Sequence, residues 1–199
     1  MKKRMLVIGL FLLAGCASMA FGDTVTLTLI PANGMISGRP GQTVGWGFTL
    51  TNDTDYLLVT AADFCSDVNC FNHPSDGTFT DFIAQFNFIV VGPPPEKSTV
   101  SQAFNASLLT GVGSFLISPS ATAGELIAGL IVLTYDLYSV SPNDPNFNPN
   151  IDTISTGNLI STDAEVKVST IPEPGTLLLL LSGLGLSWLA RLRRRSSGA

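Results

Sequence analysis

The chain has 199 residues and a formal net charge of −5; 45% of its residues are hydrophobic and 13% are charged. Seven of its ten basic residues lie at the two ends, so residues 23–171 hold three basic and 14 acidic residues, a formal charge of −11. Such an anionic surface argues against nucleic acid or anionic lipid as a partner, because binding to phosphates requires Lys or Arg.

The N-terminus has the three parts of a secretory signal peptide. Residues 2–4 are basic, residues 5–14 are apolar, and small residues follow. Residues 20–22 read Ala-Phe-Gly and offer small side chains at the two positions that signal peptidase requires. This pattern predicts a signal peptide over 1–22 and a mature protein that begins at Asp23.

A second cleavage site stays open in the same segment. Residues 13–16 read Leu-Ala-Gly-Cys, which resembles a bacterial lipobox, in which Cys16 is lipidated and becomes the first mature residue. We favour cleavage before Asp23, because the chain carries a second export-related segment at its C-terminus and has less need of an acyl anchor.

Residues 23–171 are long enough for one domain and alternate with the period of β-strands. Trp46 is in phase with Val44, Phe48 and Leu50, which places it in the core. We expect about seven strands, near 25–29, 44–51, 56–60, 82–90, 100–108, 126–140 and 163–168, with turns of Gly, Pro, Asn and Asp between them.

Many short strands without an amphipathic helix predict a mainly β ectodomain over 23–171, an antiparallel β-sandwich. The segment 39–52, Arg-Pro-Gly-Gln-Thr-Val-Gly-Trp-Gly-Phe-Thr-Leu-Thr-Asn, resembles the second strand of immunoglobulin-like bacterial surface domains. The resemblance covers 14 residues and implies an immunoglobulin-like arrangement of the strands.

Two cysteines stand close together in the ectodomain. Cys65 and Cys70 form an even pair in a chain expected to reach an oxidising compartment, so we expect a disulfide that shapes a small loop. Zinc is the alternative, but a zinc site takes about four ligands, and His73 is the only other soft candidate nearby.

The segment 143–152 reads Asn-Asp-Pro-Asn-Phe-Asn-Pro-Asn-Ile-Asp and places oxygen-bearing side chains at every second position from Asp144 to Asp152. Hard cations take six to eight oxygen ligands from flexible loops, so Ca²⁺ held by these two carboxylates is one interpretation. A solvated turn is the other, since turns are built from Asn, Asp and Pro, and we expect no cofactor.

No combination of residues indicates catalysis. His73 lies in a polar stretch without a nucleophile motif, and we expect an exposed loop residue. Six aspartates between positions 53 and 81 could supply paired carboxylates, but aspartates are common at turns. The sequence therefore predicts a protein that is not an enzyme.

The last 28 residues have three ordered parts. Pro172, Glu173 and Pro174 come first, and residues 176–190 form a nearly apolar run, expected to be a helix. At 1.5 Å per residue that helix rises about 23 Å, short for a hydrocarbon core of about 30 Å. The basic residues that follow are expected to stay in the cytoplasm; they are Arg191, Arg193, Arg194 and Arg195.

This order resembles the PEP-CTERM sorting signal, here over 172–199. The resemblance implies that a membrane-embedded exosortase recognises Pro172-Glu173-Pro174 and cuts nearby, after signal peptidase has acted at the other end. The chain would be held in the inner membrane by its C-terminal helix before processing. It would then reach the cell surface or extracellular matrix of a Gram-negative bacterium that makes extracellular polysaccharide.

Two functions from different classes follow. The first is a non-catalytic cell-surface or extracellular-matrix protein, processed by an exosortase. The alternative is a carbohydrate-binding β-sandwich module, possible also as a lipoprotein through Cys16. Because sugar binding by a sandwich usually needs exposed aromatic side chains, the exposure of Tyr138 and Phe147 discriminates between the two.

Overall fold

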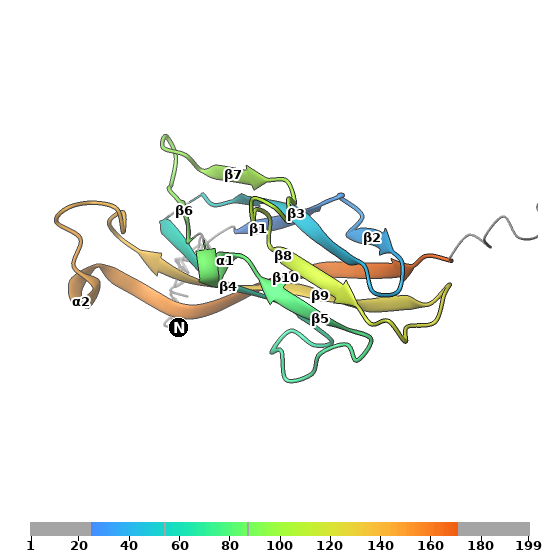
Figure 1. Ribbon diagram of the computed structural model, residues 1–199. Coiled ribbons are helices and arrows are strands. Elements are labelled where there is room, and N and C mark those ends of the chain that lie inside the picture. Colours follow the sequence, from blue (N-terminus) through green and yellow to red (C-terminus); the bar gives the residue numbers. More distant parts are fainter. Residues whose placement is uncertain (1–24, 54, 87, 171–199) are drawn as a thin grey trace, which may run out of the picture.

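The computed structural model describes residues 25–170 except 54 and 87, and in that part the chain forms ten strands and two short helices (Figure 1). One sheet has the order β1, β3, β8, β5. The strand β8 pairs with the first half of β3, and β7 pairs with its second half. The strands of this sheet are β1 (Thr26–Ile30), β3 (Thr43–Thr51), β8 (Gly113–Ile117), β5 (Gly77–Asp81) and β7 (Thr99–Gln102).

The second sheet also has five strands, in the order β2, β10, β9, β4, β6. Its strands are β2 (Met35–Gly38), β10 (Thr153–Val168), β9 (Leu126–Tyr138), β4 (Tyr56–Cys65) and β6 (Ile89–Val91). Figure 1 shows the hairpin of β9 and β10 running the length of the molecule, with α2 (Pro149–Asp152) at one end. The other end leads to the last described residues.

The two sheets pack face to face, which makes the domain a mainly β sandwich and confirms the predicted class. Trp46 from β3 contacts Phe64 from β4 at a ring-centroid distance of 5.1 Å, and Phe64 contacts Phe115 from β8 at 5.3 Å. Trp46 is fully buried, as its phase predicted, and its Nε1 donates a hydrogen bond to the Gly34 carbonyl at 2.7 Å. Burial of each such ring stabilises the fold by about 2 to 3 kcal/mol.

The alternation of side chains along the strands assigns their buried and exposed faces as the sequence predicted. On β3 the residues Phe48 and Leu50 are buried, while Thr49 and Thr51 face outward and hydrogen-bond to the outward hydroxyls of β7. At the end of β10, the even-numbered residues from Ala164 to Val168 are buried. The expected strands at 25–29, 44–51 and 126–140 are therefore confirmed as β1, β3 and β9.

The sandwich is not purely antiparallel, which corrects the prediction. β2 runs parallel to β10, with Met35 opposite Glu165 and Gly38 opposite Val168. The reason is that the chain leaves the first sheet after β1 and, after four connecting residues, joins the second sheet at β2 without reversing its direction (Figure 1). The strand β2 was not predicted.

The predicted strand at 82–90 is wrong. Residues Ile83–Phe86 form the helical turn α1, and only the short strand β6 follows. The Asp81 carboxylate accepts hydrogen bonds from the backbone N–H groups of Ile83 and Ala84, which bends the chain at that point. Phe86 and Phe88, which the period of two places on one face with Phe82, are exposed, whereas Phe82 is buried.

The predicted strand at 100–108 is too long. It ends at Gln102 in β7, and Leu108 is 69% exposed. The Asn105 side-chain oxygen accepts hydrogen bonds from the backbone N–H groups of Ser107 and Leu108, which forms a turn instead of a ladder. The strands β5 and β8, which pair with each other, were not predicted.

Within residues 25–170, no helix is long and apolar enough to cross a membrane. The expected signal peptide and C-terminal hydrophobic helix lie outside the described residues.

Candidate functional site

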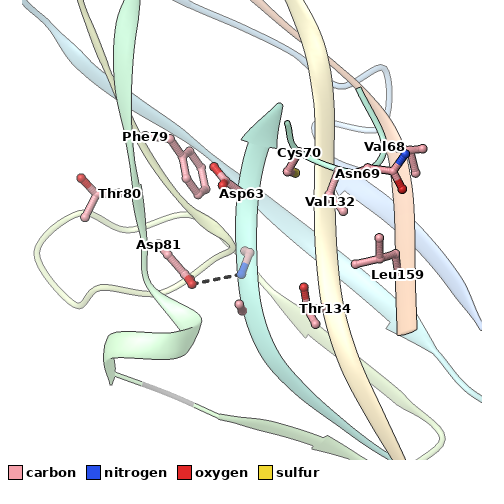
Figure 2. Close-up of a pocket in the computed structure, with 12 residues that line it drawn as sticks. Asp63, Val68, Asn69, Cys70, Phe79, Thr80, Asp81, Val132, Thr134 and Leu159 are labelled. Carbon is pink, nitrogen blue, oxygen red and sulfur yellow. Dashed lines mark hydrogen bonds between the residues drawn. The ribbon is translucent and has the colours of Figure 1, made fainter. Parts of the chain in front are cut away.

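The part of the domain with the most side-chain chemistry lies along the second half of β4. The strand β6 pairs with β4 only over Leu57–Val59, so within the described residues the segment 61–65 of β4 is paired on one side alone, with β9. The strand β5, at the edge of the other sheet, lies beside it (Figure 2). Side chains of β5 therefore reach the edge of β4.

Two carboxylates accept hydrogen bonds from backbone N–H groups along this edge. Asp81, the last residue of β5, accepts a hydrogen bond from Ala62 N at 3.0 Å through Oδ2, drawn as the dashed line in Figure 2. Asp63 accepts a hydrogen bond from Phe64 N at 2.8 Å through Oδ1. Because an unpaired strand edge invites pairing with other chains, these two bonds protect the edge.

Next along the chain is the loop closed by Cys65 and Cys70, which are bonded to each other, as predicted. The Asp67 carboxylate lies at the centre of the loop and accepts hydrogen bonds from the backbone N–H groups of Asn69, Phe71 and Asn72 at 3.0 to 3.3 Å. The side-chain amide of Asn72 donates a fourth bond at 3.1 Å. The loop is therefore organised by one disulfide and one carboxylate.

These donors change the acidity of Asp67. Partial desolvation acts to raise the pKa of the carboxyl, but the hydrogen bonds from Phe71, Asn72 and Asn69 stabilise the charged form and outweigh it. The pKa of Asp67 therefore lies below its ordinary value. The loop conformation and the ionised carboxylate stabilise each other.

His73 lies after this loop and contacts Asp63, with 2.8 Å between Nε2 and Oδ2. The side chains of His73 and Asp63 are 51% and 40% exposed, which confirms an exposed histidine. The donor atoms of Asp63, Cys65 and His73 lie within 4.8 Å of one another. Cys65 is bonded to Cys70, so it offers no thiolate, and the zinc alternative lacks the ligand that it needs.

Beside these groups is a cavity of about 530 Å³, between β5 and the disulfide loop (Figure 2). We call it the β4-edge groove. Asp63 and Asp81 line it, together with polar and apolar groups from the disulfide loop, β5, β9 and β10. These groups are Asn69, Thr80 and Thr134, and Val68, Phe79, Val132 and Leu159.

The loop predicted as a possible calcium site joins β9 to β10. Asp144 Oδ1 accepts hydrogen bonds from the backbone N and the side-chain Nδ2 of Asn146, at 2.7 and 3.2 Å. Asp152 Oδ2 accepts one from Asn148 N at 2.7 Å, next to the helical turn α2. Both carboxylates thus shape turns, and binding of Ca²⁺ by Asp144 and Asp152 stays a hypothesis.

The aromatic pair at the same end of the sandwich does not form an open platform. Tyr138 is 8% exposed, and its ring meets the Phe147 ring edge-on at 5.1 Å. Burial, with the charge and the hydrogen bond of Asp136, raises the pKa of Tyr138. Phe147 is half-buried. The aromatic side chain with the greatest exposure in the described part is Phe71, 83% exposed on the disulfide loop.

The remaining predicted sites lie outside the described residues. They are Cys16, the Pro172-Glu173-Pro174 motif, and the basic residues Arg191, Arg193, Arg194 and Arg195. Sequence reasoning placed His73 and the two cysteines together, but it missed the roles of Asp63, Asp67 and Asp81. Their position at strand ends and turns was visible, yet their partners are set by the tertiary fold.

Comparison with known proteins gives no family. No protein-family model matches the chain, and no curated protein does. Among solved structures, it is similar to the Caenorhabditis elegans MSP family member WR4, with 9% identity, 72% of this chain and 97% of that chain covered, and a TM-score of 0.32.

Two bacterial structures give similar values. CaCohA2 from Clostridium acetobutylicum has 22% identity, covers 74% of this chain and 92% of its own, and has a TM-score of 0.28. The sixth cohesin of scaffoldin B from Acetivibrio cellulolyticus has 10% identity, covers 74% and 99%, and has a TM-score of 0.26. With TM-scores this low, the fold rests on the two sheets described above.

Proposed function

We propose that the chain is an exported, non-catalytic protein of the cell surface or extracellular matrix. The observation that carries this proposal is that its clustered carboxylates accept hydrogen bonds from the protein itself. Asp63, Asp67 and Asp81 each accept one or more backbone N–H groups, and Asp63 also holds His73. A general acid or base needs a carboxyl free to exchange its proton with substrate, and these are engaged in maintaining the fold.

Export and processing form the second part of the proposal. A disulfide is typical of an oxidising compartment, which supports export. The last strand ends at Val168, with only three residues between it and Pro172, so the Pro172-Glu173-Pro174 motif would follow closely on the folded domain. Proline favours an extended chain at this point, which suits recognition by a membrane exosortase.

The mass of the mature protein recovered from cells tests the processing step. Replacement of Glu173 by Ala is expected to leave an unprocessed chain that keeps its C-terminal segment. The matched control is Glu165→Ala in β10, which removes the same side chain from the folded domain and should be processed normally. Normal processing of both variants would remove the exosortase from the proposal.

Carbohydrate binding is the second candidate function, and the β4-edge groove favours it. The groove combines two carboxylates, the Thr134 hydroxyl and the Asn69 amide with the ring of Phe79, and its volume of about 530 Å³ lies within the range of small-ligand sites, roughly 300 to 1,000 Å³. Tyr138, whose exposure would have favoured sugar binding, gives no support, because its ring is buried.

A further inference from the structure

The charge of the β4-edge groove limits what can enter it. Two carboxylates, Asp63 and Asp81, line the groove, and no Lys or Arg does among the residues described. Asp81 already accepts three backbone N–H groups, and Asp63 accepts one and contacts His73, but a carboxylate has about four lone-pair sites, so each keeps a site for a further donor. The groove therefore repels phosphates and uronic acids and attracts a cationic group.

The aromatic ring in the groove favours the same kind of group. Phe79 in β5 lines the cavity together with both carboxylates (Figure 2). An aromatic face attracts an ammonium ion placed over it, and carboxylates form charge-assisted hydrogen bonds with its N–H groups. A ring beside two carboxylates is thus suited to an amine.

The rest of the lining matches a ligand with many hydroxyls. Asn69 and Thr134 supply side-chain donors and acceptors from the disulfide loop and from β9 (Figure 2). Val68 and Leu159 supply apolar contacts. Sugar rings present both hydroxyl groups and C–H faces, so alternation of polar and apolar lining fits a saccharide better than a wholly apolar amine.

An extended peptide fits this edge less well. A peptide that adds to a sheet edge needs the N–H groups of that edge for its hydrogen bonds. Ala62 N and Phe64 N already donate to Asp81 and Asp63. A compact ligand that contacts the side chains avoids this conflict.

From these observations we propose that the β4-edge groove binds an amine-bearing saccharide, with its ammonium group at Asp63 and Asp81 and its ring beside Phe79. This inference deepens the proposed role as a protein of the cell surface or extracellular matrix, and it rests on that role. It names the chemical class of the ligand, and it assigns the disulfide loop as one wall of the site through Val68 and Asn69.

Titration calorimetry on the full-length exported protein tests the site, with a glucosamine trimer as the probe at near-neutral pH and low ionic strength. Its N-acetylated counterpart has the same sugar skeleton without the charge. We expect the amine form to bind at least about 10-fold more tightly, because charge-assisted bonds are stronger than neutral ones.

Two variants locate the binding. Asp63→Asn should weaken the glucosamine trimer about 10-fold, whereas Asp163→Asn, an exposed carboxylate at the outer face of β10, should leave it unchanged. The second variant is the matched control for the loss of one negative charge. Asp63 is chosen over Asp81 because Asp81 also caps α1.

Three results would overturn the inference: equal binding of the two trimers, equal loss in both variants, or no binding of the amine form. A trilysine peptide that bound as tightly as the amine trimer would overturn the saccharide class. Processing at Glu173 is read from the mass of the cell-derived protein. The role as a processed surface protein is therefore judged separately from this site.

Discussion

The Asp81 carboxylate links the two sheets of the sandwich, because it accepts the backbone N–H of Ala62 in β4 at 3.0 Å while it belongs to β5 in the other sheet. Its second oxygen accepts hydrogen bonds from Ile83 N and Ala84 N at 2.6 and 3.3 Å. One side chain thus closes a strand edge, starts the turn α1 and lines the β4-edge groove.

Removal of that carboxylate should lower the stability of the domain. Asp81→Ala leaves the N–H groups of Ala62 and Ile83 without their partner, so we expect the free energy of unfolding to fall by about 2 kcal/mol. Urea denaturation measures the loss. Asp76→Ala is the control, since among the described residues the hydrogen bond of that side chain is with neighbouring Ser75, and its loss should change stability by less than about 0.5 kcal/mol. An equal loss in both variants would contradict the role of Asp81.

The sequence predicted the parts of the fold in which alternation is regular. β1, β3 and β9 alternate clearly between apolar and polar or contain β-branched runs, and the position of Trp46 followed from its phase alone. Alternation between 82 and 90 was equally regular and still misleading. The alternation of apolar residues could not reveal that the chain bends after β5. That bend depends on the hydrogen bond from Ile83 N to the Asp81 side chain, which the alternation does not record.

The candidate site was less visible for a different reason. Asp63 and His73 are ten residues apart, and Asp81 and Ala62 are nineteen apart. The first contact forms only when the segment after β4 folds back onto that strand, and the second only when β4 and β5 lie side by side. The first half of β10 was missed because residues 153–162 are mostly polar or small and pair with β9 along a largely exposed face. Local patterns describe the buried side of a strand better than its neighbours.

The disulfide should act locally. It closes a loop of only a few residues, so the double variant Cys65→Ala, Cys70→Ala should lose about 2 kcal/mol of unfolding free energy at most. Amide hydrogen exchange should rise in residues 66–72 and stay slow in the paired β4 and β9. Faster exchange throughout β9 would show that the loop supports the whole sandwich. Two free thiols in the freshly isolated, alkylated protein would contradict the bond itself.

Acid should loosen the same loop. The pKa of Asp67 is lower in the folded chain than its ordinary value of 3.8. Its contribution to stability is therefore complete above that value and is lost as the pH falls through the lower, folded-state pKa. NMR shifts of the Asn69, Phe71 and Asn72 amides should change together in that acid range. In Asp67→Asn the common transition should disappear; its persistence would assign it to another group.

Calcium at the loop 143–152 is the last test. Asp144 and Asp152 each accept backbone hydrogen bonds within the loop, and these contacts explain their positions without a metal ion. The domain from 23 to 171 carries a charge of −11, so any divalent cation will associate with it weakly, and stabilisation by calcium alone proves no site.

The comparison with magnesium makes that test specific. A calcium site should raise the melting temperature more with Ca²⁺ than with Mg²⁺, because Mg²⁺ demands a tighter octahedral geometry. We expect equal shifts for the two ions, and equal shifts again after Asp144 and Asp152 are both replaced by Asn. A shift selective for Ca²⁺ that vanishes in the double variant would contradict this expectation. It would mean that Asp144 and Asp152 bind a metal ion, and that their hydrogen bonds to backbone N–H groups are the arrangement of the loop without the ion.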